Sequence, residues 1–458
     1  MSQTNEITDV LIVGAGPTGL TAACEALRHG LTVRLIERRA SRALYSKALV
    51  LHARTLEVLE LMGCAEPLVA AGQRFKALHL RTSSQASAVR VDLLDRNWGD
   101  TRYPYWLSIP QYEVERVLEA RLLALGGRIE WSTELTGLSN GADAVTATLT
   151  TPSGQTESHR ARWVLGCDGG RSATREQVGI AFERAEVGVT FALADVQTRC
   201  GLVEDEGHVV LSAEGVLLIV PMPEPGVWRL IAQVPADGEL ASAAEWNALV
   251  HRRAGLDLGI HQLGWSSKFN VTSGVAERFR TGRVFLLGDA AHVHSPVGGQ
   301  GLNTGVQDAH NLMWKLGLQR LPAFEGAAGE ALLDTYQAER QPIAAQMVRN
   351  TSLATRVLTV NNPLVRALRG AVVRLALRSE RFNDRLGRGV GMLDLRTAGQ
   401  PRLPNPSLPD GGRLHDRLDP RAPTRLHWQG QELVVRPDRI VARPGSLPTS
   451  VSVVAQEG

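Results

Sequence analysis

Three glycines and one carboxylate near the N-terminus have the spacing of a phosphate-binding turn. Gly14, Gly16 and Gly19 follow the apolar run 10–13, and Glu37 comes 18 residues after the last glycine. The first glycine permits a tight bend, the second lets a pyrophosphate approach the backbone, and the third lets a helix pack on the strand. A carboxylate at position 37 would bind both hydroxyls of a ribose and disfavours a 2′-phosphate. We therefore expect an adenine dinucleotide, either FAD or NAD.

The elements around this turn must direct it toward the ligand. Residues 10–13 are apolar without polar alternation, which is typical of a strand buried on both faces. Pro17 and Thr18 then begin a helix that runs to His29, and its free N–H groups and positive dipole end would face the phosphates. Residues 31–36 predict the next buried strand, which ends at the acidic position.

A basic segment, residues 38–47, begins with Arg38. Its side chains could hold phosphates beside the adenosine, or the segment could be a solvated loop. Residues 52–62 have the spacing of an amphipathic helix and contain Arg54. Gln111 begins a second, longer helix.

Two later strands also end in residues suited to a ligand. The strand predicted at 161–166 runs into Asp168 and Gly169, and the strand that begins at 284 ends at Asp289. In an open α/β sheet, ligands bind in the crevice at the carboxyl ends of the strands. The first junction therefore suits such a crevice, and the second leads into a glycine-rich loop.

That loop can lay its backbone against a flat ligand. It contains Pro296, Gly298, Gly299, Gly301, Leu302 and Asn303. Asn303 begins a predicted helix to about Leu318, and the positive end of this helix would stabilise the negative charge of a reduced flavin. His294 lies just before the loop and has either a catalytic or a structural role.

The character of the sequence changes between residues 181 and 274. Short β-rich runs separated by glycine and proline turns, with one helix at 242–253, predict a separate sheet domain. Its Trp228, Trp265 and Phe269 could line an aromatic pocket or pack in a core. The predicted division is 1–180 for the first part of the dinucleotide-binding domain, 181–274 for the substrate-binding sheet domain, 275–395 for the return of the first domain with C-terminal helices, and 396–458 for a short appendage.

Composition limits the possible partners. The chain has 458 residues, of which 43% are hydrophobic and 21% charged, and its net charge of +3 is too small to predict binding to nucleic acid or membrane. No apolar run is long enough to span a bilayer. The four cysteines are scattered without a CxxC pair, so we expect buried reduced thiols in a cytoplasmic protein and no metal site.

With these motifs in order, the chain resembles the class A, single-component FAD-dependent aromatic hydroxylases. This is the para-hydroxybenzoate-hydroxylase-like family, and the match is to its phenol and aromatic-polyketide branch. The resemblance rests on GAGPTG with Glu37, CDGGRSATR at 167–175, LLGDAAHVHSPVGGQGLNTGVQDAHNLMWKL at 286–316 and LDTYQAERQP at 333–342.

The resemblance covers about residues 8–345 and implies an α/β fold. A Rossmann-like FAD-binding domain of the GR2 type would carry an inserted mixed or antiparallel β-sheet substrate domain. Many relatives end in a thioredoxin-like domain, and residues 396–458 would be a truncated remnant of it.

The resemblance also implies roles for individual residues. FAD would contact Gly14, Gly16, Pro17, Thr18, Gly19, Glu37, Arg38, Arg54, Gln111, Asp168, Gly169, Asp289, Pro296, Gly298, Gly301, Leu302 and Asn303. His294, Pro296 and Gly299 would lie at the catalytic position beside the flavin ring. A tyrosine relay in the sheet domain is unsupported, because all five tyrosines lie outside 181–274.

The implied reaction uses NADPH or NADH to reduce the flavin, which then takes up O₂ as a C4a-hydroperoxide. Its distal oxygen would hydroxylate a phenolic or polycyclic aromatic small molecule in a monomer or homodimer. Two alternatives remain open: Baeyer–Villiger or epoxidation chemistry on a polyketide-type substrate, and a flavin-binding protein that does not oxygenate its ligand.

Overall fold

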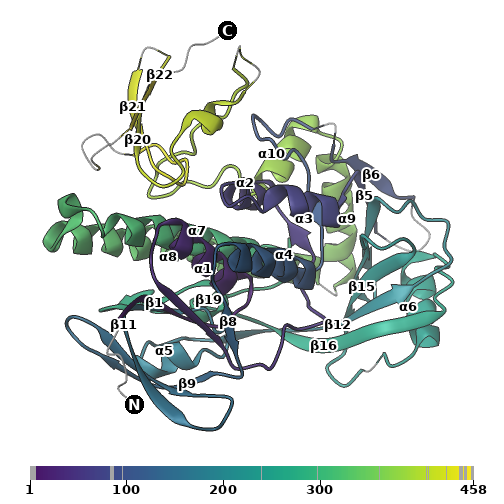
Figure 1. Ribbon diagram of the computed structural model, residues 1–458. Helices are drawn as coiled ribbons and strands as arrows, with labels where there is room; N and C mark the ends of the chain where they lie inside the picture. The colour runs from purple at the N-terminus through teal and green to yellow at the C-terminus, as the bar shows by residue number, and fades with distance from the viewer. Residues whose placement is uncertain are drawn as a thin grey trace.

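The computed structural model describes residues 7–454, apart from residues 83–86, 95, 239, 297, 360–361, 409, 411, 430, 443–446 and 448–450. Two large sheets dominate the described chain, which also has two small three-stranded sheets, one of them near the C-terminus (Figure 1). Helices α1, α4 and α7 lie together above the first sheet in this view, and the second sheet extends away to the right.

The first sheet is built around β1, the strand that the sequence predicts to be buried. Its parallel part has the order β18 (Val284–Leu286), β11 (Thr156–Gly166), β1 (Thr8–Val13), β2 (Val33–Glu37) and β8 (Ile129–Trp131). β17 (Arg280–Thr281), β9 (Glu134–Asn140) and β10 (Val145–Thr150) add antiparallel pairs. Val10, Leu11 and Ile12 of β1 have no exposed surface, because both faces of the strand are covered.

The covering helices place two glycine-rich turns side by side. α1 (Pro17–Arg28), α4 (Gln111–Ala124) and α7 (Gly301–Leu318) pack on one face of the first sheet. α2 (Ala53–Glu60), α3 (Ala65–Ala71), β3 (Val50–Leu51), β4 (Gln73–Arg74) and β7 (Leu107–Ser108) lie beside them, and α5 (Ala173–Gln177) follows β11. The strand–turn–helix prediction for residues 8–37 is confirmed to within two residues at each boundary.

The second sheet has eight strands in the order β19–β16–β12–β15–β14–β13–β5–β6. They are β19 (His292–Val293), β16 (Gln262–Val275), β12 (Ala185–Gln197), β15 (Val227–Val234), β14 (Gly215–Pro221), β13 (Glu206–Ser212), β5 (Ala77–Arg81) and β6 (Val89–Asp92). The sheet is mixed, because β5 pairs with β13 in parallel while the other pairs are antiparallel. It therefore recruits strands from residues 77–92, which precede the inserted segment predicted from the sequence.

Helix α6 (Ala243–Ala254) covers the outer face of the second sheet. It begins at the predicted position because Ser242 and Glu245 form a capping box. Trp246 of the helix and Trp228 of β15 are fully buried in the core between helix and sheet. Of the two readings of Trp228, core packing is therefore correct.

The remaining helices lead to the C-terminal segment. α8 (Ala327–Leu358) contains Pro342 and is followed by α9 (Pro363–Ala376) and α10 (Glu380–Val390). The last sheet has the order β21 (Gln431–Val435), β20 (Thr424–Trp428) and β22 (Val451–Val454). Its strands enclose a small core that includes Leu403, Leu414 and Leu426.

Within the described residues, no helix has the length and apolar character needed to cross a membrane. The same part of the chain holds no group of three or more His, Cys, Asp or Glu side chains that could bind a metal ion.

Candidate functional site

The three glycines of the first turn meet different surroundings. A Cβ on Gly14, whose φ is +102°, would lie 2.5 Å from the carbonyl oxygen of Cys167. A Cβ on Gly19 would lie 1.9 Å from the carbonyl oxygen of Gly14. A Cβ on Gly16 would meet no atom within 4 Å. The first and third glycines are thus required by the packing of the chain, whereas the second borders open space where a ligand can approach.

The N-terminus of α1 opens onto the same space. Gly16 is its N-cap, Pro17 occupies the first turn, and no side chain caps the helix. The N–H groups of a first helical turn have no partner within the helix, so a phosphate can accept their hydrogen bonds. This local geometry fits a dinucleotide pyrophosphate.

Thr18 joins three of the predicted motifs. Its Oγ1 lies 2.6 Å from the position of a Cβ on Gly288 and 2.3 Å from that of a Cβ on Gly305. Because Gly288 precedes Asp289 and Gly305 lies in the first turns of α7, the first turn, the β18 junction and the start of α7 meet at this side chain. Thr18 therefore has a packing role, and its contact with a cofactor stays a prediction.

Glu37 is nearly buried at the carboxyl end of β2. Its Oε2 accepts a hydrogen bond of 2.9 Å from the Ala15 N–H, and its Oε1 accepts bonds of 3.0 Å from both the backbone N–H and the Nε of Arg39. Burial alone would raise the pKa of Glu37, but these hydrogen bonds lower it below its ordinary value. The ionised carboxylate lies beside the glycine turn, where a ribose would need it. Arg38, which the resemblance places against FAD, is exposed, and its neighbour Arg39 binds the carboxylate.

The junction after β11 is closed by a hydrogen-bonded cap. Asp168 accepts bonds of 2.6 Å from the Ser172 hydroxyl and 2.9 Å from the Thr174 N–H, and Ser172 in turn caps α5. Gly169 has a φ of +80°, and a Cβ there would meet nothing within 4 Å. Asp168 thus stabilises the start of α5, while Gly169 borders open space.

Asp289 brings a carboxylate to the region between the two sheets. It follows β18 and is exposed. Burial lowers the pKa of Lys47, and the nearby Asp289 carboxylate opposes that shift. The Lys47 Nζ lies 4.5 Å from the centre of the Phe269 ring on β16. Residues of the first sheet, the basic segment and the second sheet therefore come together here.

Asn303, where the sequence predicts the following helix to begin, holds the glycine-rich loop in place. Asn303 is fully buried and accepts a 2.9 Å bond from the His52 N–H; its Nδ2 donates to the carbonyl oxygens of Val50, at 2.8 Å, and Gly299, at 2.7 Å. The His52 Nε2 lies 2.7 Å from the Gly298 carbonyl oxygen. Asn303 and His52 thus fix the loop from behind.

The front of this loop is open. Pro296 and Gly298 are exposed, and Leu302 is half-buried. α7 begins at Gly301, two residues earlier than expected, and no side chain caps it. Its unpaired N–H groups therefore face the same opening as the loop backbone, which suits a planar ligand that gains negative charge.

His294 has the chemistry of a proton acceptor. Its Nδ1 lies 2.9 Å from the Ser295 carbonyl oxygen, which can only accept, so Nδ1 carries the proton. Burial lowers the pKa of His294. Its Nε2 is buried without a partner among the described residues, and it lies 3.7 Å from the position of a Cβ on Gly301. A neutral His294 can thus offer a free lone pair beside the loop.

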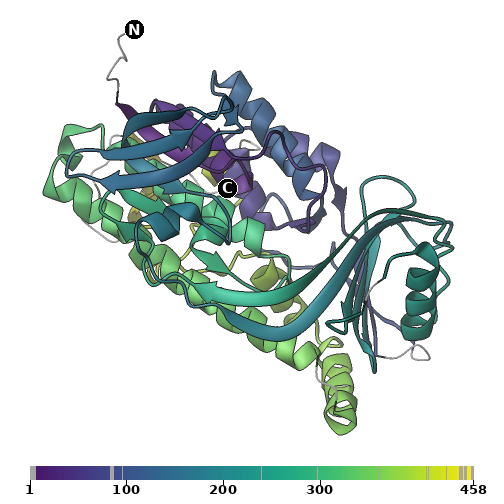
Figure 2. The same ribbon diagram turned by 90° about the horizontal axis from the view of Figure 1, so that it is seen from below.

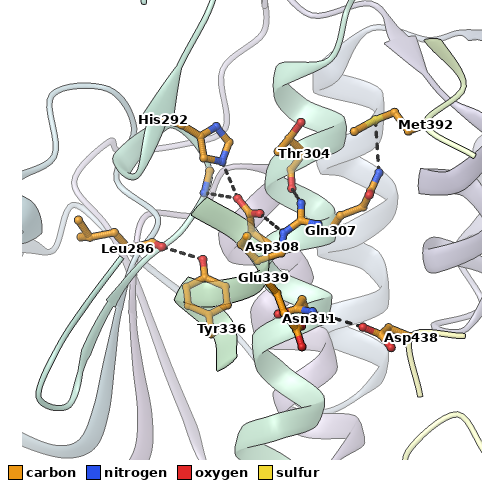
Figure 3. A network of polar contacts seen from close by, with 12 residues as sticks. Leu286, His292, Thr304, Gln307, Asp308, Asn311, Tyr336, Glu339, Met392 and Asp438 are labelled. Atoms are coloured by element: carbon orange, nitrogen blue, oxygen red, sulfur yellow. Dashed lines mark hydrogen bonds and ion pairs between the residues drawn. The ribbon is translucent and has the colours of Figure 1, made fainter. Parts of the chain in front are cut away.

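A buried ionic network behind the loop was not predicted from the sequence (Figure 3). Asp308 on α7 has no exposed surface; its carboxylate lies 2.6 Å from the His292 Nε2 and accepts a 2.6 Å bond from the Arg340 Nε. Burial raises the pKa of Asp308, but Arg340 and His292 outweigh burial and lower it to about 2. Asp308 also accepts a 3.2 Å bond from the Gly288 N–H. Asp308 lies in the motif DAHNL and Arg340 in the motif ERQP. The spacing of the two motifs could not show that these side chains meet.

Two predicted cofactor contacts lie in other surroundings. Arg54 donates to Glu57 at 2.9 Å and to the carbonyl oxygen of Asp438. Gln111 donates to Glu115 at 2.8 Å. Their proposed contacts with FAD stay predictions.

A cavity of about 390 Å³ lies between the second sheet and the loops of the first. Its aromatic lining is Tyr45, Tyr112 and Trp265, and its acidic lining is Glu113, Asp195 and Glu224. The Tyr45 and Trp265 rings stack with centres 5.6 Å apart. Trp265 therefore takes the pocket-lining role, unlike Trp228.

Comparisons with known proteins agree with this geometry. The family model described as "FAD binding domain" matches residues 7–351. A 12-dehydrotetracycline 5-monooxygenase/anhydrotetracycline 6-monooxygenase of Streptomyces rimosus subsp. rimosus is 39% identical over 417 residues, which are 88% of this chain and 80% of that relative. A 6-methylpretetramide 4-monooxygenase of Streptomyces rimosus is also 39% identical over 77% of this chain, but the chain spans only 62% of its length.

Solved structures match almost the whole chain. The anhydrotetracycline hydroxylase OxyS from Streptomyces rimosus superposes with a TM-score of 0.77 at 32% identity, covering 96% of this chain and 95% of that one. CabE, an aromatic hydroxylase from angucycline biosynthesis, gives a TM-score of 0.74 at 27% identity and covers 96% of both chains.

Proposed function

The chain belongs to the FAD binding domain family, and from this we propose that it is an FAD-dependent monooxygenase that hydroxylates a phenolic or polycyclic aromatic molecule with NADPH or NADH and O₂. The observation that carries the proposal is the meeting of three motifs at Thr18. There the uncapped start of α1 meets the junction before Asp289 and the start of α7, the helix that follows the Gly298 loop. The names of the relatives support a polycyclic aromatic substrate.

Specific residues would hold FAD in this space. The backbone around Gly16 would bind the pyrophosphate, Glu37 the adenosine ribose, and Asp289 the ribityl hydroxyls. The backbone from Gly298 to Asn303 would lie against the ring. When bound, FAD supplies the redox chemistry by which electrons from a nicotinamide activate O₂.

The protein would position the substrate, exclude water and provide a proton acceptor. Asn303 and His52 hold the loop in one place, which limits the orientations that a substrate can take beside it. Phe269 and the apolar inner face of the second sheet exclude water from the other side. The free Nε2 of His294 can accept the proton of a phenol that lies within hydrogen-bond reach.

The test begins with the absorbance spectrum of the purified full chain. NADH and NADPH oxidation is then followed with and without a panel of phenols and anthraquinone-type compounds, while H₂O₂ is measured. We expect a yellow protein whose NAD(P)H oxidation rises with an aromatic compound and yields a product heavier by one oxygen atom, with little peroxide. A ring-expanded or epoxide product would support the alternative oxygenation chemistry instead. A colourless protein that cannot be reconstituted with FAD would overturn the proposal.

A further inference from the structure

Exposed apolar side chains lie at the end of α8 and along α9. These side chains, here called the α9 patch, are Leu353, Val357, Leu364, Val365, Leu368, Val372 and Leu375. They are between 46 and 81% exposed. Soluble monomers rarely expose large apolar side chains in such a group, and a group of this kind marks an interaction surface.

The patch on α9 is a single stripe. Leu364, Leu368, Val372 and Leu375 follow one another at intervals of four, four and three residues, so they share one face of the helix. They are 81, 66, 56 and 70% exposed, respectively. In Figure 2 the light-green helix α9 stands at the lower edge of the molecule, beyond both large sheets. The stripe is therefore accessible to a large partner.

The charged residues in the segment that carries this stripe have one sign. Residues 341–379 contain six arginines, at 349, 356, 366, 369, 374 and 378, and no aspartate or glutamate. The acids that bracket the segment are Glu339 and Glu380, and Glu339 is buried against Lys315 and Arg436. The net charge of +3 for the whole chain conceals this local concentration.

This charge pattern selects between possible occupants. A symmetric dimer would bring together two copies of a segment that contains six arginines and no acid to balance them. An anionic lipid surface instead offers an apolar layer for the leucines and phosphate groups for the arginines, which is the combination that basic amphipathic helices bind. We propose that the α9 patch docks the protein onto an anionic bilayer surface, with α9 lying in the interface. This inference does not depend on the proposed function.

Vesicle co-sedimentation of the full chain tests the proposal. Phosphatidylcholine vesicles are compared with vesicles made of equal parts phosphatidylcholine and phosphatidylglycerol, at low and high NaCl. We expect sedimentation with the anionic vesicles, a fall in the bound fraction with salt, and little binding to the neutral ones. Absence of binding to anionic vesicles at low salt would overturn the proposal.

Matched variants distinguish binding through the α9 patch from nonspecific binding to vesicles. Leu368→Asp combined with Leu375→Asp should reduce vesicle binding about tenfold, because two leucines that would enter the apolar layer of the bilayer are lost. Leu123→Asp on α4, where the side chain is 58% exposed, should leave binding unchanged. An equal loss of vesicle binding in the double variant and in Leu123→Asp would contradict the proposal. A concentration-dependent dimer that the double variant dissociates, without lipid binding in the parent protein, would assign the patch to a second copy and overturn the lipid surface.

Discussion

Among single residues, the glycines of the first turn have two different roles. Two of them are required by the packing of the fold, and one leaves space for a ligand. Gly14 and Gly19 have backbone atoms where a Cβ would be, and Gly16 has empty space there. Gly16 has a φ of −76°, which alanine adopts without strain. Substitution at positions 16 and 19 should therefore have different consequences.

Gly16→Ala should fold almost normally and bind FAD poorly. We expect a loss of stability of about 1 kcal/mol, because alanine is a poorer N-cap than glycine by roughly this amount. We also expect an affinity for FAD about tenfold lower, because the Cβ enters the ligand's space. Thermal unfolding of the apoprotein and titration with FAD measure both quantities. Gly19→Ala should instead cost about 3 kcal/mol by overpacking. Equal destabilisation by the two variants would contradict this division.

Asp308→Asn should destabilise the protein strongly. It leaves the buried Arg340 guanidinium without its carboxylate partner, and losing one partner of a buried ion pair costs about 3–5 kcal/mol. Urea unfolding measures the change. Asp334→Asn is the control, because Asp334 pairs with Arg280 while 71% exposed and should contribute less than about 1 kcal/mol. If the two variants lose similar stability, the network is not a structural anchor.

Residues whose roles follow from local backbone geometry could be predicted from the sequence, and those that depend on distant partners could not. The spacing of Gly14, Gly16 and Glu37 predicted a turn whose geometry the structure shows. One partner of Arg54 is the carbonyl oxygen of Asp438, 384 residues away in the C-terminal segment, and no local pattern indicates such a contact. The same holds for Asp308 and Arg340.

Among the elements, α2 shows how a distant segment changes the surroundings of a helix. Its spacing predicted an amphipathic helix with one exposed face, but every residue from Ala53 to Leu59 is buried. The reason is the C-terminal segment, whose Arg402 forms two bonds with Glu57, one of them 2.9 Å long. Burial raises the pKa of Glu57, but Arg402 and Arg54 lower it to about 2. Arg402 therefore bonds the C-terminal segment to the first domain at this helix.

Arg402→Gln should lower stability by about 3 kcal/mol, because Glu57 would keep its buried charge with only Arg54 to balance it. Denaturant unfolding followed by circular dichroism gives the value. Arg417→Gln, which removes a half-exposed ion pair with Asp410, should change stability by less than about 1 kcal/mol. If Arg402→Gln left the stability unchanged, the contact between the C-terminal segment and α2 would not stabilise the protein.

For the whole molecule, buried ionisable groups predict a two-stage loss of stability in acid. Burial lowers the pKa of His29, His52 and His208 from 6.5 to about 4. Between these pH values the unfolded chain binds protons that the folded one does not, so stability falls as pH falls from 6.5 to 4. Glu57 and Asp308, with pKa values lowered to about 2 by their arginine partners, add a second loss between about pH 4.5 and 2.

Melting temperatures measured from pH 7.5 to pH 3 test this order. We expect a decline that begins near pH 6.5, where the histidines of the unfolded chain begin to bind protons. His52→Gln should flatten part of the first stage and leave the second unchanged. A melting temperature that stays constant down to pH 4.5 would show that the histidines do not take part.

Strand β16 has a consequence for how such proteins can diverge. It pairs with β12 from Gln262 to Ser273 and then with β19 at Gly274 and Val275, so one continuous strand carries Trp265 and Phe269 and ends at the segment before the glycine-rich loop. An inserted or deleted residue would turn every following side chain to the opposite face and misplace that segment. Lineages that change substrate should therefore exchange side chains along β16 while conserving its length.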